Sequence, residues 1–192
     1  MARTSGSSSE KTRPLVRAAA LKLFARHGFA AVSMRQIAAE VGVQEGALYR
    51  YTPDKQSLLF ELMQMHMEDL LQAWEQVDAG GSPQEQLDRF VRFHILHHLD
   101  RVDAVFIAYM ELRNLTEANF AEIEGMRAKY EKVLEDILVA CGGAGLGDAK
   151  LTTLAVLAML TGVNTWYREG GRLDREAVVQ TYVAMVRRVV GE

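Results

Sequence analysis

Apolar residues recur with helical spacing along almost the whole chain, and no segment shows the every-second-residue alternation of a β-strand. The predicted fold class is therefore all-α. Glycine, proline and capping residues interrupt the pattern and so locate about nine helices. The expected helices cover 14–27, 33–41, 45–51, 53–77, 82–98, 101–115, 116–141, 149–169 and 175–190.

Most expected helix starts carry a residue whose side chain can accept a hydrogen bond from a free backbone N–H group. These residues are Ser33, Ser82, Thr116, Asp148 and Asp174. Residues 82–85, with the sequence SPQE, combine a cap, a first-turn proline and a glutamate three residues on. Residues 1–11, rich in Ser and Gly, are predicted to form a disordered arm. The short helices within 12–58 should form one domain and the longer helices of 59–192 a bundle.

The N-terminus and the cysteine content predict a cytoplasmic protein. The N-terminus is polar and lacks the apolar core of a signal peptide. The longest apolar run, 151–163, is too short to span a bilayer, so no membrane partner is expected. The single cysteine, Cys141, excludes an intramolecular disulfide and fits a reducing compartment.

The formal net charge of −3 hides an asymmetry along the chain. Residues 1–60 hold nine Lys or Arg against four acids, a net of +5, and residues 61–192 hold 13 basic against 21 acidic residues, a net of −8. This division predicts that only the N-terminal part contacts a polyanion.

The two short helices expected at 33–41 and 45–51 are joined by a tight turn at Gly42, as in a helix-turn-helix. Leu15, Ala19, Leu23 and Phe24 lie on one face of the first helix. Ile37, Val41, Val43 and Leu48 can face inward and join Leu23 and Phe24 in one small core. The residues left outside offer donors, a methyl group and an aromatic hydroxyl, which suit phosphates and base edges. They are Arg35, Gln36, Gln44, Glu45, Ala47, Tyr49 and Arg50. Two packed helices of a purely structural hairpin would give the same pattern.

Further motifs narrow the choice. The first helix carries LF and HGF, the second SMRQIA, the turn GV, the third LYRY, and a lysine opens the fourth. Over about residues 14–60 this combination resembles the DNA-binding domain of the TetR family of transcriptional regulators. It departs from the family at Thr52, where phenylalanine is commoner, so the packing between the third and fourth helices is in question.

The resemblance implies a role for each matching residue, with double-stranded DNA as the partner. Ser33 would cap the second helix and contact a phosphate. Tyr49 would give its hydroxyl to a phosphate, and Lys55 would reach another. Arg35, Gln44, Ala47 and Arg50 are candidates for contacts with base edges.

One recognition helix reads only a few base pairs, so a homodimer on an inverted repeat is expected, with half-sites roughly 34 Å apart or a little more. In the family the last two helices pair with their symmetry mates. The apolar and small residues of 149–169 and 175–190 are the candidates here. The predicted dimer interface consists of Leu154, Leu157, Ala158, Thr161, Thr165, Tyr182, Val183, Val186 and Val190, with Gly162 allowing close approach.

The family holds a small-molecule pocket in the bundle, where an effector changes the spacing of the two reading heads. Candidate lining residues are aromatic side chains, side chains with a polar group, and one methionine, and for each the favoured interpretation is ordinary core or surface packing. They are Phe90, Phe93, His94, His97, Met110, Glu111, Phe120, Arg127, Tyr130, Asn164 and Trp166.

The C-terminal half resembles those TetR regulators that control lipid, steroid or branched-chain acid catabolism and respond to acyl-CoA thioesters. Trp166-Tyr167-Arg168 and Gly170-Gly171-Arg172-Leu173 carry this weaker similarity. The hypothesis is an acyl-CoA effector, with Arg113, Arg127 or Arg168 as partners of its anionic part. A hydrophobic drug or metabolite is the competing class.

Other functions are less well supported. No nucleophile and base stand at a recognisable spacing, and the GGAGLG of 142–147 follows no strand, so an enzyme is not expected. His94 and His98 could bind a metal with Glu111, but no further ligand stands at a firm spacing; neither metal nor cofactor is predicted. A protein of this fold that has lost DNA binding and keeps a ligand-binding or scaffold role is the alternative. Repression is the family's commoner mode.

Overall fold

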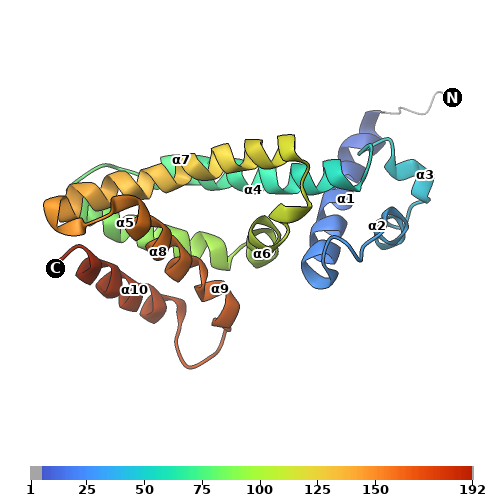
Figure 1. Ribbon diagram of the computed structural model, residues 1–192. Helices are drawn as coiled ribbons and strands as arrows, with labels where there is room; N and C mark the ends of the chain where they lie inside the picture. Colours follow the sequence, from blue (N-terminus) through green and yellow to red (C-terminus); the bar gives the residue numbers. More distant parts are fainter. Residues whose placement is uncertain (1–5, 192) are drawn as a thin grey trace. The chain divides into compact units, whose positions relative to one another are not determined.

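The computed structural model describes residues 6–191, with the side chains of residues 12–142 and 145–191. Every regular element in this range is a helix, so the predicted all-α fold class is confirmed (Figure 1). The elements are α1 (Gly6–His27), α2 (Met34–Val41), α3 (Glu45–Leu48), α4 (Lys55–Val77), α5 (Pro83–Leu99), α6 (Val102–Met110), η1 (Leu112–Asn114), α7 (Glu117–Gly142), η2 (Gly143–Leu146), α8 (Ala149–Thr161), α9 (Val163–Trp166) and α10 (Arg175–Val189).

The first helix begins earlier than the sequence indicates. Of the predicted arm, residues 1–5 lie outside the described range, whereas α1 already starts at Gly6 and encloses Pro14. The sequence argument placed Pro14 in the first turn, where its missing N–H needs no partner. In the structure the helix continues N-terminally past the proline, at the loss of one backbone hydrogen bond.

The chain forms two compact units. Unit 1 consists of the described residues up to Met67 together with Asp103–Ile123, and unit 2 consists of Glu68–Val102 and the residues from Glu124 onward. The predicted domains, 12–58 and 59–192, are defined by resemblance to a family and not by compactness. That division stays a prediction.

Within unit 1, α1 packs on α2 and α2 packs on α3. The buried stripe of α1 includes Val16, Ala20 and Phe24, spaced four residues apart. Phe24, Ile37 of α2 and Leu48 of α3 are all fully buried. Leu15, predicted to be in the core, is 57% exposed. The buried stripe is rotated by about one residue from the predicted one, because Val16 rather than Leu15 occupies the inward position.

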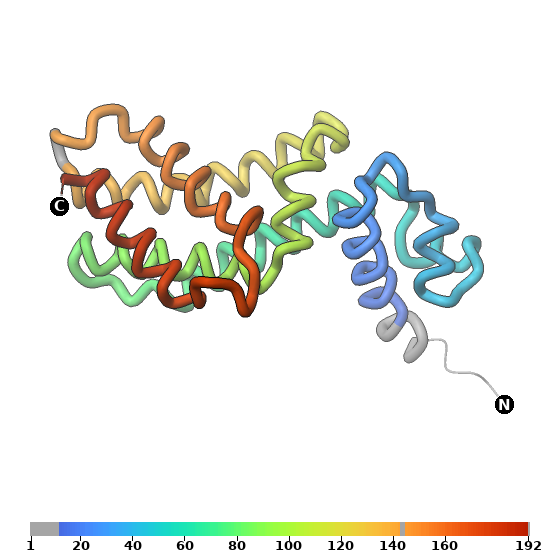
Figure 2. Tube along the Cα trace, turned by 90° about the horizontal axis from the view of Figure 1, so that it is seen from below, coloured from blue at the N-terminus to red at the C-terminus, as the bar shows by residue number. Residues whose placement is uncertain are grey.

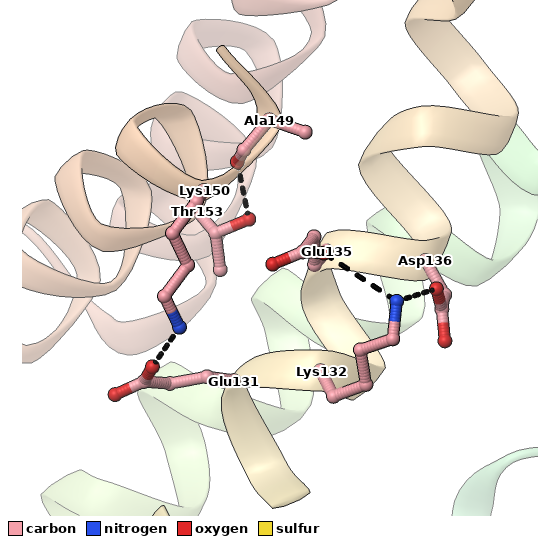
Figure 3. A network of polar contacts seen from close by, with 7 residues as sticks. All are labelled: Glu131, Lys132, Glu135, Asp136, Ala149, Lys150 and Thr153. Atoms are coloured by element: carbon pink, nitrogen blue, oxygen red, sulfur yellow. Dashed lines mark hydrogen bonds and ion pairs between the residues drawn. The ribbon is translucent and has the colours of Figure 1, made fainter. Parts of the chain in front are cut away.

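Within unit 2, α5 contacts α8, α9 and α10 (Figure 2). Three ion pairs join the α10 region to α5 and the residue after it: Arg92 with Glu176 at 2.7 Å, Arg187 with Asp88 at 2.5 Å, and Arg175 with Asp100 at 2.5 Å. On the other side, Lys150 of α8 pairs with Glu131 of α7 at 2.5 Å (Figure 3). The helices of unit 2 are therefore connected by ion pairs at the surface as well as by their apolar core.

Predicted caps are confirmed where the chain enters its helices. Ser33 and Gln36 form a capping box before α2, Ser82 and Glu85 form one before α5, and Asp148 and Asp174 cap α8 and α10. The fourth helix begins at Lys55 instead of Pro53, because the Asp54 carboxylate accepts the Ser57 N–H at 2.7 Å and so acts as the cap.

The helix expected over 149–169 is broken into α8 and α9 at Gly162. A Cβ at Gly162 would lie 3.2 Å from the Ala158 carbonyl oxygen, so the chain is tight at this point. The helix expected over 101–115 likewise ends at Met110 and passes into η1. No helix in the described part of the chain has the length and apolar character needed to cross a lipid bilayer.

Candidate nucleic-acid and effector sites

The α2–α3 pair is held rigidly by short-range contacts. Ser33 Oγ accepts the Gln36 N–H at 3.3 Å while Gln36 Oε1 accepts the Ser33 N–H at 2.8 Å, which satisfies both ends of the helix start. Gly42 has φ +78°, a left-handed conformation that favours glycine, and the Val43 N–H then bonds to the Ala38 carbonyl at 2.9 Å. The helix-turn-helix predicted from the sequence is formed.

The outward surface of this pair carries the predicted reading residues. Ser33, Arg35, Gln44, Tyr49 and Arg50 are exposed, and Ala47 is half-buried. Tyr49 is a large aromatic residue with 53% of its surface exposed. Within the described residues, the side chains of Arg35, Gln44 and Arg50 have no hydrogen bond or ion pair, so their side-chain donors are available to another molecule. An exposed tyrosine beside unengaged guanidinium and amide groups suits phosphates and base edges.

Lys55 is only partly directed outward. Its Nζ donates to the carbonyl oxygens of Phe29 and Val32, both at 2.8 Å, and lies 4.2 Å from the centre of the Phe29 ring. An ammonium group has three N–H donors, so one remains for a phosphate. The sequence analysis missed the structural role, because the two carbonyls lie 26 and 23 residues away along the chain.

Thr52, where the sequence departs from the expected phenylalanine, is 4% exposed. Its hydroxyl donates to the Asp54 carbonyl oxygen at 2.9 Å, and its N–H bonds to the Leu48 carbonyl oxygen at 3.1 Å. A buried hydroxyl that has its hydrogen bond costs little. The junction between α3 and α4 is therefore complete without the aromatic residue.

Several of the predicted effector residues come together inside unit 2. Nδ1 of His94 lies 3.2 Å from the Tyr130 hydroxyl and Nε2 lies 3.1 Å from the Thr161 hydroxyl. The Phe90 ring lies 5.2 Å from Tyr130, and the His98 ring stacks on His94 with centroids 3.9 Å apart. These side chains form a buried aromatic cluster in the interior of the bundle. The hydrogen bonds of His94 with the Tyr130 and Thr161 hydroxyls run through it.

Two further predicted residues, Phe93 and His97, lie at the edge of this cluster, with ring centroids 5.0 Å apart. Nε2 of His97 is 3.3 Å from Asp69 Oδ2. Burial, assisted by the Arg101 charge, lowers the pKa of His97 to about 4, against the opposing effect of Asp69 and Asp100. His97 is therefore neutral near pH 7.

The remaining predicted effector residues of unit 2 lie elsewhere. Arg127 is half-buried, 3.3 Å from Glu124. Asn164 is half-buried, and both atoms of its side-chain amide are inaccessible to solvent and have no hydrogen-bond partner. Trp166 is 46% exposed, and its ring lies nearly parallel to that of Tyr182, with ring centroids 6.4 Å apart.

A surface pocket of about 290 Å³ lies at the α9–α10 connection. It is lined by Trp166, Tyr167, Arg168, Gly171, Arg172 and Leu173. Arg168 donates to its neighbours' carbonyl oxygens, including that of Tyr167 at 2.7 Å, and Arg172 has no ion-pair partner in the described part of the chain. The pocket thus combines aromatic surface with two positive charges that no carboxylate neutralises. Of its lining, the sequence analysis named Trp166 as an effector-lining candidate and Arg168 as a candidate partner of the anionic part.

Three predicted effector residues belong to unit 1 and not to the bundle interior. Met110 is 56% and Phe120 41% exposed. Glu111 is 7% exposed, and its carboxylate accepts hydrogen bonds from the Phe29 N–H and the Asn114 side chain. Both of its oxygens are thus bonded within unit 1, and its place in an effector pocket stays a prediction. Arg113, the other expected anion partner in this unit, is exposed.

The predicted dimer residues divide into two groups. Leu154, at 44% exposed, with Ala158 and Thr165, faces outward, and Tyr182, Val183 and Val190 are half-buried. Leu157 and Val186 are 8% and 0% exposed and pack inside the chain, and Thr161 bonds to His94. Those three thus have partners within the chain, and the predicted interface stays a prediction. The exposed stripe instead takes in Leu151, Met185 and Val189.

A groove of about 260 Å³ lies between α8 and the end of α10, lined by Leu151, Thr152, Ala155, Val156, Met159 and Val189. Among the residues that the structure describes, no three His, Cys, Asp or Glu side chains are placed to hold a metal ion.

Comparison with known proteins gives two family matches. Residues 16–62 match the family described as bacterial regulatory proteins of the tetR family. Residues 80–190 match the family described as a tetracyclin repressor-like C-terminal domain. Together they cover the α2–α3 pair and nearly all of the bundle.

Individual proteins agree with these matches. The transcriptional repressor KstR2 of Mycolicibacterium smegmatis is 29% identical over 175 residues, which is 87% of this chain and 84% of the repressor. The crystal structure of a tetR-family regulatory protein from Rhodococcus RHA1 superposes with a TM-score of 0.87 at 28% identity, covering 94% of this chain and 97% of the other.

A third similar protein is AibR, solved in complex with isovaleryl coenzyme A and operator DNA. Its TM-score is 0.82 at 27% identity, covering 91% of this chain and 97% of AibR. The matched tetR family consists of transcriptional regulators and not of enzymes. With both of its halves matched, this chain belongs to the TetR family of bacterial transcriptional regulators.

Proposed function

We propose that this regulator is a repressor that binds an inverted-repeat operator as a homodimer and leaves it when an acyl-CoA thioester binds to unit 2. The observation that carries the proposal is the outward face of the α2–α3 pair, where Tyr49 is 53% exposed and the donors of Gln44 and Arg50 are unengaged. Because its partner is chromosomal DNA, the cytoplasm is the proposed compartment.

The proposed roles on DNA follow from chemistry and exposure. Gln44, at the start of α3, suits a bidentate contact with adenine, and Arg35 or Arg50 suits guanine. The Ala47 methyl group suits the methyl group of thymine. Ser33, Tyr49 and Lys55 are assigned to phosphates, which position the protein without reading sequence.

Selection of binding sites from a randomised duplex pool at fixed near-physiological salt tests this function first, with Tyr49→Ala as the control. Enrichment of an inverted repeat by the wild type alone supports a dimeric sequence-specific regulator. Failure of the wild type to enrich any site, with and without acyl-CoA present, overturns it.

The operator then separates the two kinds of contact. Gln44→Ala should relax preference at particular bases, whereas Lys55→Ala should weaken binding to all sequences and flatten the dependence on salt. Because Lys55 also holds two carbonyl groups, Lys55→Ala must be assayed well below its own melting temperature. Equal effects of both variants on every sequence would contradict these roles.

The proposed dimer surface is the exposed stripe of α8 and α10, with Leu151 at 66%, Leu154 at 44% and Met185 at 42% exposed. Large apolar side chains gathered on adjacent helices are typical of a subunit interface. Leu154→Glu should convert dimer to monomer in sedimentation equilibrium. Val139→Glu is the matched control, since Val139 is 47% exposed on α7, away from the stripe. A monomeric wild type would exclude the interface.

The effector proposal rests on the pocket at the α9–α10 connection. Trp166 offers a face on which a planar base can stack, and Arg168 and Arg172 supply charge for phosphates. AibR, which is 27% identical, was solved with isovaleryl coenzyme A, and that ligand contains both a base and phosphates.

A thermal-shift panel of isovaleryl-CoA, longer acyl-CoA thioesters, free CoA and free carboxylic acids tests the effector class. Acyl-CoA should raise the melting temperature of the wild type but not of Trp166→Ala or Arg172→Ala. Arg188→Ala, an exposed arginine on α10, is the control. Stabilisation by free apolar acids or drug-like compounds, but not by thioesters, would favour the competing class.

The alternative of a ligand-binding protein without DNA binding was suggested by the departure at Thr52. That residue is buried and hydrogen-bonded at an intact junction, so this reason for the alternative is gone. The site selection described above distinguishes the two functions directly.

A further inference from the structure

Glu111 is a buried carboxylate that joins two segments far apart in the sequence. Its Oε1 atom accepts the Phe29 N–H at 3.1 Å, and its Oε2 atom accepts the Asn114 side-chain N–H at 2.5 Å. Phe29 follows Gly28, which has φ +80° and ends α1. Glu111 thus reaches from the end of α6 to the loop that leads from α1 into α2.

The carbonyl group of the same residue, Phe29, is held from α4. Lys55 donates to the carbonyl oxygens of Phe29 and Val32, and Gln56 donates through its side chain to the Asn114 carbonyl oxygen. Both polar groups of Phe29 are therefore fixed by side chains. We name Glu111, Asn114, Lys55 and Gln56 the Phe29 bracket; all its members and Phe29 lie in unit 1.

The chemistry of the bracket favours a carboxylate at position 111. A carboxylate accepts hydrogen bonds only, and both of its oxygens here meet N–H donors. Hydrogen bonds to an ionised acceptor are about twice as strong as neutral ones. Burial of such a group is costly unless it is bonded in this way, so the two bonds are needed together.

The held loop determines where the reading helices begin. Only Ala30, Ala31 and Val32 separate Phe29 from Ser33, the cap of α2, and Val32 is held by Lys55. A shift of this loop would displace the α2 start and, with it, the outward face of α3. Catalytic and binding groups depend on such support from residues that do not touch the ligand.

We propose that Glu111 is a positioning residue for operator binding: it holds the loop at Phe29, and thereby α2 and α3, from the end of α6. The proposal rests on the DNA-binding function given above. It assigns Glu111 no contact with DNA or with effector. It makes the segment Asp103–Ile123 a part of the reading apparatus, although this segment is distant from it in sequence.

The test compares three full-length variants for affinity to the selected operator, by fluorescence anisotropy over a range of salt concentrations and at least 15 °C below each variant's own melting temperature. Glu111→Met should weaken operator binding about tenfold or more and reduce the salt slope, since fewer phosphates are engaged at once. Glu111→Gln should stay within about threefold of the wild type, because the amide oxygen still accepts the Phe29 N–H and the Asn114 amide can turn to pair with the new NH₂ group.

Glu61→Met is the matched control. Glu61 is another carboxylate of unit 1, it pairs with Arg13 and Arg17, and it ties α1 to α4 without touching the Phe29 loop. It should lower the melting temperature while leaving operator affinity and salt slope near those of the wild type. Should Glu111→Met fail to fold, Asn114→Ala removes one bond of the carboxylate and is expected to weaken operator binding by a smaller factor.

Wild-type affinity and salt slope in Glu111→Met would overturn the proposal. So would an equal loss in Glu61→Met, which would show that any weakening of unit 1 has the same effect. If the wild type selects no operator, the function itself fails; hydrogen exchange then decides whether the Phe29 N–H is protected in the wild type and Glu61→Met and loses protection in Glu111→Met.

Discussion

The α2–α3 pair and the interior of unit 2 are built by contacts of very different range. The bonds that shape the pair join residues three to five apart, such as Ser33 with Gln36 and Val43 with Ala38. In unit 2, His94 meets residues 36 and 67 positions away, and Arg187 meets Asp88 99 positions away. A surface that depends on local geometry can be recognised from a short motif, whereas an arrangement of side chains that depends on distant pairings cannot.

The largest effect on stability should come from truncating one large buried side chain in each of the two cores, in separate variants. Phe24 and Phe90 are both 0% exposed, so replacing either by Ala should cost about 3–5 kcal/mol. Phe24→Ala should abolish operator binding, and Phe90→Ala should lower the urea midpoint followed by the fluorescence of Trp74, whose ring lies 5.1 Å from Phe90. Identical shifts of the Trp74 transition in both variants would show that the two cores unfold as one cooperative unit. The contrast between the two regions would then not extend to their stability.

The next effect depends on pH and is confined to unit 2. The pKa of His97 is about 4 in the fold against an ordinary value of 6.5, so between these values the unfolded chain binds more protons. The free energy of unfolding should therefore fall as the pH drops from about 6.5 towards 4, by at most about 1.4 kcal/mol per pH unit from this group. Urea titrations at several pH values measure the slope, and His97→Gln should reduce it; an unchanged slope would assign the dependence to other groups.

A smaller effect tests the local construction of the α2–α3 pair. Gly42→Ala places a Cβ where no atom lies within 4 Å, so its cost, about 1 kcal/mol or more, comes from the left-handed backbone alone. Gly46→Ala is the matched control: its Cβ is equally unobstructed, its φ is ordinary, and the replacement should be neutral or stabilising by up to about 1 kcal/mol. Thermal unfolding measures both, and equal destabilisation would contradict the argument.

The smallest effect is expected at the surface of unit 2. Arg92 and Glu176 pair at 2.7 Å with side chains 48% and 53% exposed, so solvent and salt screen the pair and it should contribute little to the free energy of unfolding. A double-mutant cycle of Arg92→Ala and Glu176→Ala in low and high salt measures it. A coupling that is larger and independent of salt would mean that long-range pairs contribute more to unit 2 than exposure indicates.

The elements that the sequence predicted well have signals within a few residues. Ser33, Ser82, Asp148 and Asp174 were identified as caps from their own short segments, and the structure confirms them. Gly42 was likewise identified as the turn between α2 and α3. In such cases the chemistry of one or two side chains determines the local backbone.

The errors concern direction and distance. Leu15 was placed in the core because helical spacing alone does not fix which of two neighbouring residues faces inward, and Val16 is the buried one. The hydrogen bond between Glu111 and Phe29 was not predicted, because nothing near Glu111 in the sequence indicates a partner 82 residues away. The function of a polar residue on a helix depends on what the fold brings to it.

Helix α8 carries two apolar stripes on different faces, one buried within the chain and one exposed. The residues that stabilise the fold are therefore different from those that could select a partner subunit. Leu157 and Leu160 pack within the chain, while Leu151 and Leu154 remain exposed on the same helix. Substitution of the exposed pair can change which subunit is accepted without disturbing the core, given the dimer proposed above. A cell that holds many regulators of this fold needs such independence, because mixed dimers would recognise hybrid operators; specificity of pairing is a difference between affinities that these exposed residues are free to set.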